Sequence, residues 1–286
     1  MSDVGDPLLA VPGAESAFAR IQDVLKQYGL DDLGDWARQM LLDGASDERI
    51  TMELYDQPAF KQRFPVIEER RQAGLPPVSP TDVLNYENSW SQIAVAAGLP
   101  AGFQGRDVAQ EAMGKNLSVS ELQSRVQQGY VAVAQADPAI RDSFRNYFGM
   151  DGDNALAAFF TDPERALPDL ERMVTEAQIG GAATRAGFGL SQDQSERLTR
   201  GGATGAQAAT AFQTLAGSRQ LFDRTVSETG DIDIAEQGAA SALGQDAAAT
   251  EEIKRRAQQR QAAYAGDDSA YMTTAGVTGV GTARSA

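Results

Sequence analysis

Apolar residues recur along this chain at intervals of three and four positions, the spacing that places them on one face of a helix. Phe18, Ile21 and Leu25 form the first such stripe, which ends before Gly29, a residue suited to the left-handed conformation that closes a helix. The next stripe contains Trp36, which we interpret as a core residue or, alternatively, as an anchor in an interface. Segments in which apolar and polar residues alternate, as in a half-buried strand, are rare. The pattern predicts an all-α fold.

The segment from Gly44 to Pro80 shows the helical pattern most clearly. Ser46 is suited to cap a first short helix, and Pro58 is suited to begin a second one. Apolar pairs four residues apart mark the two helices: Ile50 with Leu54, and Phe60 with Phe64. We expect a helical hairpin with a Pro-Ala-Phe knuckle at Pro58, ended by Gly74 and the prolines that follow it.

Similar units recur further along the chain. Ser118 and Glu121 have the spacing of a capping box, as have Thr204 and Gln207. The first box opens a predicted helix whose apolar stripe contains Leu122, Val126, Tyr130 and Val133. A Pro-Ala-apolar knuckle at Pro138 follows it, as at Pro58. Because the spacing between these units is irregular, we predict an irregular array of short helical hairpins rather than a regular solenoid.

Changes in composition divide the chain into four parts. Residues 1–14 contain glycines and prolines and are expected to form an extended N-terminal arm. Residues 15–224 form the predicted all-α body, with a further division near residues 100–117. Residues 225–266 are expected to be an Ala-rich and basic helical segment. Residues 267–286 are rich in Gly, Ser and Thr, a composition typical of a flexible tail.

The glycines between Ala177 and Gly189 admit two interpretations. A phosphate-binding loop needs a strand before its glycines and a helix after them. Here a predicted helix precedes the glycines, and their spacing fits neither common nucleotide-binding fingerprint. Small residues also let two helix backbones approach closely, and we predict close helix packing for this segment.

The amino-acid composition excludes most kinds of catalytic site. The chain has no cysteine and no histidine, which excludes disulfides, thiolate or imidazole metal sites, and nucleophiles activated by histidine. The carboxylates lack the spacing of a calcium loop, also at Asp151–Asn154. We therefore predict no catalytic residue, no cofactor and no metal site. The N-terminus has neither the basic region nor the apolar stretch of a signal peptide, and no run of eighteen apolar residues is present, so we expect a cytoplasmic product that does not bind membranes.

The charge of the chain is −15, which argues against binding to a nucleic acid backbone, because neutralising phosphates requires a basic face. Acidic residues are concentrated in one segment, where only Arg38 and Arg49 oppose them. The segment contains eight carboxylates: Asp31, Asp32, Asp35, Asp43, Asp47, Glu48, Glu53 and Asp56. They form either a solvated helix face or an electrostatic patch for a basic partner.

One long pattern resembles a known family. Residues 63–87 read RFPVIEERRQAGLPPVSPTDVLNYE, residues 177–198 read AQIGGAATRAGFGLSQDQSERL, and residues 253–268 read IKRRAQQRQAAYAGDD. These segments resemble a family of structural proteins encoded among the virion and tail genes of tailed bacteriophages. The resemblance implies a place in the virion and contacts with portal, connector, tail or capsid proteins. Cyclic assemblies of this kind would contain multiple copies or a ring of this chain.

Three functions are therefore considered. The first is a non-enzymatic structural component of the phage particle, at the head-to-tail region, in the tail or inside the capsid near the portal. The second is an ejection protein or a peptidoglycan-active enzyme, for which Glu87, between Tyr86 and Trp90, is the one candidate acid. The third is a scaffolding factor that assists assembly and then leaves.

Overall fold

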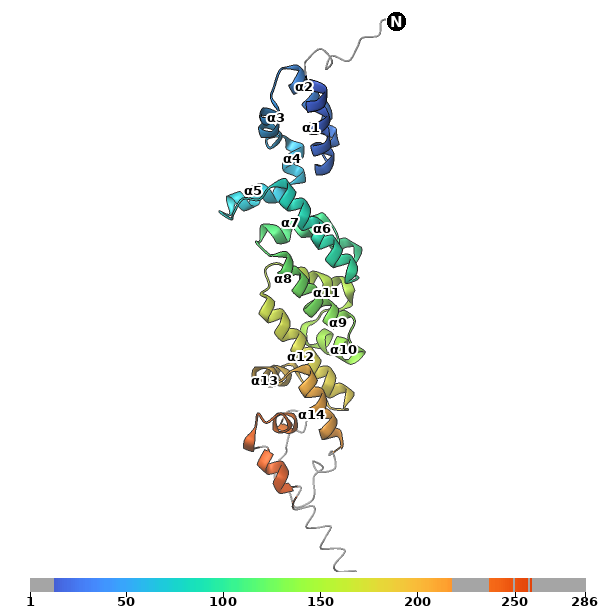
Figure 1. The fold of residues 1–286 in the computed structure, drawn as a ribbon. Coiled ribbons are helices and arrows are strands. Elements are labelled where there is room, and N and C mark those ends of the chain that lie inside the picture. Colours follow the sequence, from blue (N-terminus) through green and yellow to red (C-terminus); the bar gives the residue numbers. More distant parts are fainter. Residues whose placement is uncertain (1–12, 218–236, 249, 257, 259–286) are drawn as a thin grey trace, which may run out of the picture. The chain divides into compact units, whose positions relative to one another are not determined.

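The computed structural model describes residues 13–217, 237–248, 250–256 and 258. Within these residues the protein consists of helices and connecting turns with no strand, which confirms the predicted all-α class (Figure 1). The predicted tail (267–286) and all but the last two residues of the predicted arm (1–14) lie outside the described residues, so both stay predictions. Ala14 already belongs to the first helix.

The chain divides into two compact units. Unit 1 contains the described residues up to Gln127 together with Asp153–Leu167, and unit 2 contains Gln128–Gly152 together with the described residues from Pro168 onwards. The division expected near residues 100–117 falls inside unit 1, because α7 (Arg106–Gly114) packs there against α5 (Pro65–Gln72) and α6 (Pro80–Ala96).

Unit 1 is built from nine short helices in the described residues. Besides α5, α6 and α7 they are α1 (Ala14–Tyr28), α2 (Gly34–Leu42), α3 (Asp47–Leu54), α4 (Pro58–Arg63), α8 (Val119–Ser124) and α11 (Gly152–Thr161). Short 3-10 turns cover Asp31–Leu33 and Ala101–Phe103. The packed pairs include α1 with α2, α4 with α5, and α6 with α8.

Capping residues and prolines set the ends of these helices. Ser46 accepts a hydrogen bond from the Arg49 amide at the start of α3, as predicted. The predicted second helix of the hairpin is, however, two helices, because Pro65 ends α4 and begins α5. A proline disfavours the helical conformation of the residue before it, and Phe64 has φ −126° and ψ 54°. A capping box between Ser79 and Asp82, which the sequence analysis did not identify, opens α6.

Unit 2 contains α9 (Ala132–Ala134), α10 (Pro138–Phe148), α12 (Leu167–Arg185), α13 (Gln192–Arg200), α14 (Gly205–Gly217) and α15 (Ala239–Ala242). Thr204 and Gln207 form the predicted reciprocal cap of α14. The core of this unit is made by side chains of α12, α13, α14 and α15 and of the connections between them, and its largest members are Ile179, Phe188, Leu198, Phe212 and Leu215.

The helix predicted after Ser118 differs from the expectation in two respects. Ser118 Oγ accepts from the Glu121 amide, but the Glu121 carboxylate binds Arg125 instead of closing the box. Beyond Ser124 the backbone is π-helical over Arg125–Val131. The predicted apolar stripe is nevertheless buried at all four positions: Leu122, Val126, Tyr130 and Val133.

The glycines of α12 allow a close approach to α10, which confirms the packing interpretation. A Cβ atom on Gly181 would lie 2.8 Å from both the Cα and the N atom of Ile140. A Cβ atom on Gly180 would overlap the ring of Tyr147. Glycine is therefore the residue that fits both positions.

Candidate interaction site

Glu87, the candidate acid, holds two helices of unit 1 together. Its two carboxylate oxygens accept hydrogen bonds from Arg63 at 2.7 and 2.6 Å, in the bidentate geometry of a strong ion pair. Gln110 Nε2 donates to the same carboxylate at 2.6 Å. Tyr86 and Trp90 point to other acceptors, the carbonyls of Leu117 and Phe103. A catalytic acid of this kind requires apolar surroundings. Glu87 lacks them, because the guanidinium group of Arg63 lies next to its carboxylate.

Two further arginines are buried in unit 1, and the sequence analysis did not identify them. Arg70 donates to the carbonyls of Pro76 and Met113 and to Asn116 Oδ1. Arg125 is 1% exposed; it donates to the Glu121 carboxylate and to the carbonyls of Asp162 and Arg165.

These contacts satisfy the guanidinium groups and join segments far apart in the chain. Arg70 reaches partners up to 46 positions away, and Arg125 reaches partners up to 40 positions away. Such buried, fully bonded charges fix helices in place and offer no free group for chemistry. The sequence gives no sign of these contacts, because local spacing does not show which residues far apart in the chain will meet.

Unit 2 has one buried carboxylate. Glu176 on α12 is fully buried, and burial raises its pKa, although its ion pair with Arg172 (2.6 Å) acts in the opposite direction. Glu196 and Arg200 on α13 also act on its charge. Nearby, burial raises the pKa of Tyr147, whose hydroxyl donates to the Leu190 carbonyl. Because the Glu176 side chain is fully buried and paired with Arg172, we interpret this cluster as part of the core.

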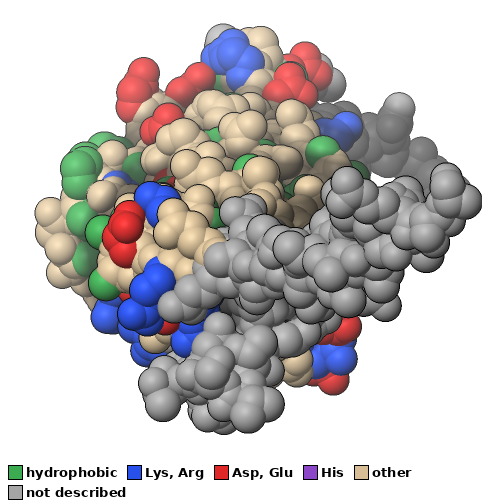
Figure 2. All heavy atoms as spheres, turned by 90° about the horizontal axis from the view of Figure 1, so that it is seen from below, with side chains coloured by type: hydrophobic (Ala, Val, Ile, Leu, Met, Phe, Trp, Pro, Cys, Tyr) green, Lys and Arg blue, Asp and Glu red, His purple; other side chains and the backbone are tan. Residues whose placement is uncertain are grey.

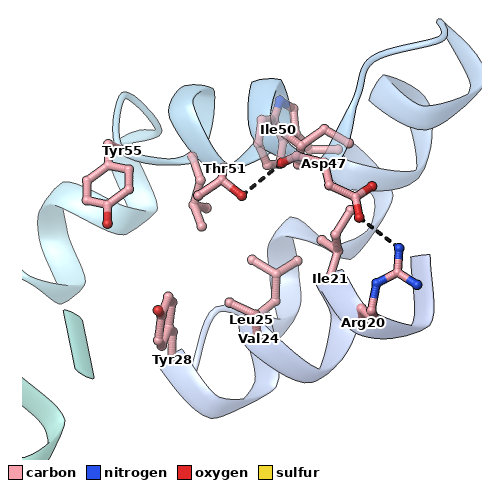
Figure 3. A pocket seen from close by; sticks show the side chains of 11 residues that line it. Arg20, Ile21, Val24, Leu25, Tyr28, Asp47, Ile50, Thr51 and Tyr55 are labelled. Carbon is pink, nitrogen blue, oxygen red and sulfur yellow. Dashed lines mark hydrogen bonds and ion pairs between the residues drawn. The ribbon is translucent and has the colours of Figure 1, made fainter. Parts of the chain in front are cut away.

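The predicted acidic segment borders an apolar hollow between α1 and α3. The hollow has a volume of about 180 Å³. Figure 3 shows side chains of α1 and α3 facing each other across it, with the Arg20–Asp47 ion pair at one end and Tyr28 and Tyr55 at the other. Its apolar lining is Ile21, Val24, Leu25, Trp36, Ile50 and Leu54. Trp36 is half-buried at this surface. Its exposure therefore lies between that of a core residue and that of an exposed anchor in an interface.

A second hollow lies on the other side of Tyr55. It has a volume of about 420 Å³ and is lined by Phe60, Phe64 and Ile67 together with the charged side chains of Asp56, Lys61, Glu68 and Arg71. The Tyr55 and Phe60 rings are in contact, with centroids 4.7 Å apart. Because Tyr55 lines both hollows, we treat them as one surface and call it the α1–α3 groove.

Exposed apolar side chains are concentrated beside this groove. Four large hydrophobic side chains stand out as exposed in the described residues, and three of them lie on α1, on α3 or directly after α3: Val24 (40% exposed), Met52 (75%) and Tyr55 (42%). Val24 and Tyr55 line the groove, whereas Met52 is not among its lining residues. Exposed apolar side chains that lie close together are typical of protein-binding surfaces.

Several exposed charges elsewhere are paired along their own helices, for example Arg71 with Glu68 and Arg200 with Glu196. On the face drawn in Figure 2, basic and acidic side chains lie interspersed. The predicted basic segment is an example: over residues 250–256 it is helical, and Lys254 pairs with Glu251 while Arg255 and Arg256 pair with Glu252. These three cations, in the described part of the segment, are therefore already paired.

Three other properties concern the whole of the described chain. No group of three or more carboxylates there is arranged to hold a metal ion. Among the helices that the structure describes, none is long and apolar enough to cross a membrane. Comparison of the sequence and structure with protein-family models, curated proteins and solved structures found no match.

Proposed function

We propose that this chain is a non-enzymatic structural component of a tailed-bacteriophage particle, which binds other virion proteins through its helical body. The observation that carries the binding role is the α1–α3 groove, where Val24 and Tyr55 are exposed beside helices that carry an excess of carboxylates. Membership of a virion is supported by the sequence resemblance described above. The partners would be portal, connector, tail or capsid proteins, and the chain would be present in several copies.

Four residues of the first segment that carries the resemblance support this proposal, because each of the four has a structural role. Arg63 binds Glu87, and Phe64 is 1% exposed in the core of unit 1. Arg70 binds the carbonyl of Met113, and Gly74 has φ +68°, which favours glycine. A pattern made of packing, capping and ion-pair residues is what selection for a rigid building block would produce.

The peptidoglycan-active alternative rested on Glu87. Because Arg63 and Gln110 occupy the Glu87 carboxylate, we do not propose this residue as a catalytic acid. The scaffolding alternative shares the helical body and the acidic charge with our proposal, and it differs in whether the chain stays in the mature particle.

The test is quantitative mass spectrometry of purified mature particles, combined with a cryo-microscopy map in which the chain is located. We expect a fixed copy number and helical density that fits units 1 and 2 separately. Presence in procapsids and loss from mature particles would support the scaffolding function instead. Absence from both kinds of particle would refute the proposal.

A further inference from the structure

We propose that the α1–α3 groove binds a basic amphipathic helix of a partner protein. This inference rests on the proposed protein-binding role but not on membership of a phage particle. The shape, the apolar lining and the charge of the groove support it, and the groove lies within unit 1.

The lining of the groove requires an occupant with an apolar face. Val24 and Tyr55 are exposed at its surface, whereas Leu25, Ile50 and Leu54 form its buried floor. Two antiparallel or crossing helices that leave an apolar gap accept the apolar stripe of a third helix, whose anchors recur every three or four residues. Tyr55, between the two hollows, is a large side chain of the type that contributes most to binding energy.

The charge around the groove determines which charge its occupant should carry. The charged side chains that line the two hollows balance one another: Arg20, Lys61 and Arg71 against Asp47, Asp56 and Glu68. The excess of negative charge comes from the helices around the first hollow, since residues 14–57, which form α1, α2 and α3, contain ten Asp or Glu and four Lys or Arg, a net charge of −6. Eight of the ten carboxylates are exposed. A surface of this sign attracts a partner rich in Lys and Arg and repels nucleic acids and anionic membranes.

A second copy of this chain is a poorer occupant. Its net charge is −15, and the described cations of its basic segment, Lys254, Arg255 and Arg256, are bound to Glu251 and Glu252. In addition, Ile253 packs against the core of unit 2, so this segment has no free apolar stripe to insert.

One ion pair at the end of the groove has a defined part in this binding. Arg20 Nη2 lies 2.8 Å from Asp47 Oδ2, and both side chains are largely exposed. An exposed pair of this kind contributes little to stability, so a Lys or Arg of the incoming helix can replace Arg20 on Asp47 at small cost. The Asp47 carboxylate would then fix the end of the bound helix.

The test uses the full-length protein and two synthetic peptides of about 18 residues, long enough for about five helical turns. Both peptides carry leucines on one face, and the other positions are lysine and alanine in the first and glutamate and alanine in the second. Binding is measured by the anisotropy of a labelled peptide. It is also measured by the tryptophan fluorescence of the protein, because Trp36 lines the groove while the only other tryptophan, Trp90, is fully buried.

We expect saturable binding of the lysine peptide, with a change in fluorescence that is lost in Trp36→Phe. The double substitution Val24→Ser and Tyr55→Ser should weaken binding by about tenfold or more, as removal of central apolar anchors does. The matched control is Val95→Ser, which changes a more exposed valine on α6 outside the groove and should leave the affinity unchanged.

Three results would overturn the inference. Equal affinity for both peptides would exclude the charge argument, and equal affinity of the wild type and the double variant would show unspecific attraction to an acidic protein. A concentration-dependent dimer, detected by sedimentation and abolished by the double variant, would assign the groove to a second copy. None of these results bears on the presence of the chain in particles, so failure here is distinguishable from failure of the proposed function.

Discussion

Replacing Gly181 by alanine tests the close contact between α12 and α10. In an open helix this change is favourable by about 1 kcal/mol, because alanine has the higher helix propensity. Here the new Cβ would lie 2.8 Å from the backbone Cα and N atoms of Ile140, whereas ordinary contacts begin at 3.4 Å. The two helices must therefore separate by about 0.6 Å, or the backbone must bend, and overpacking of this kind costs about 1–3 kcal/mol. The gain and the cost together give an expected net loss of up to about 2 kcal/mol in the free energy of unfolding.

The assay is urea denaturation followed by the helical circular dichroism signal, with the midpoint compared at unchanged slope. Gly217→Ala is the matched control, because this glycine also belongs to a helix of unit 2 but has no neighbour within 4 Å of an added Cβ. It should be neutral or slightly stabilising.

A second variant, Ile140→Ala, distinguishes the contacts made by the Ile140 side chain from those made by its backbone. A Cβ on Gly181 would also contact Ile140 Cγ1, so Ile140→Ala relieves part of the overlap but leaves the Cα and N contacts. Gly181→Ala should therefore still destabilise the Ile140→Ala protein. A Gly181→Ala protein stabilised as much as an open helix would be, by about 1 kcal/mol, would refute the close approach of the two backbones.

Three further predictions concern stability. Phe64→Ala should lower the free energy of unfolding by about 3–5 kcal/mol, as loss of a buried aromatic ring does, and an unchanged urea midpoint would show that Phe64 faces a partner instead. Glu87→Gln should lower the free energy of unfolding by about 3–5 kcal/mol, because it leaves the Arg63 guanidinium without its charge partner. The double variant with Arg63→Met should recover part of this loss in the same denaturation assay, and a double variant no more stable than the single one would contradict the pairing. Because burial raises the pKa of Glu176, the native state binds its proton more tightly than the unfolded chain does. The free energy of unfolding should therefore fall as the pH rises above the ordinary pKa of a glutamate. Glu176→Gln should remove this part of the pH dependence, and identical pH profiles of the variant and the wild type would refute this role of Glu176.

Local structure was predictable from the sequence wherever the signal is local. Ser46 and Thr204 cap their helices, and Gly29 ends α1 with φ +70°, because each of these tasks depends on a few neighbouring residues. The break at Pro65 was equally local, since a proline restricts the residue before it, but the apolar pair Phe60–Phe64 favoured a continuous helix.

Long-range contacts were not predictable in the same way. The Arg63–Glu87 pair spans 24 positions, and Arg125 binds the carbonyl of Asp162 across 37 positions. Hydrophobic periodicity fixes which face of a helix is buried but not which other helix covers it. For the same reason the acidic segment could be identified, whereas the apolar groove beside it required the relative placement of α1 and α3.

The Arg63–Glu87 pair also has a consequence for the groove. Arg63 Nε donates to the carbonyl of Tyr28 at 3.1 Å, and its guanidinium lies 4.5 Å from the centre of the Phe64 ring. Phe64 in turn contacts the Tyr28 ring, with centroids 5.6 Å apart. One arginine thus ties α6 to the end of α1 that forms a wall of the groove. Loss of the Glu87 charge should therefore loosen the groove as well as the core, and the affinity of Glu87→Gln for the lysine peptide should fall although Glu87 touches no part of the lining.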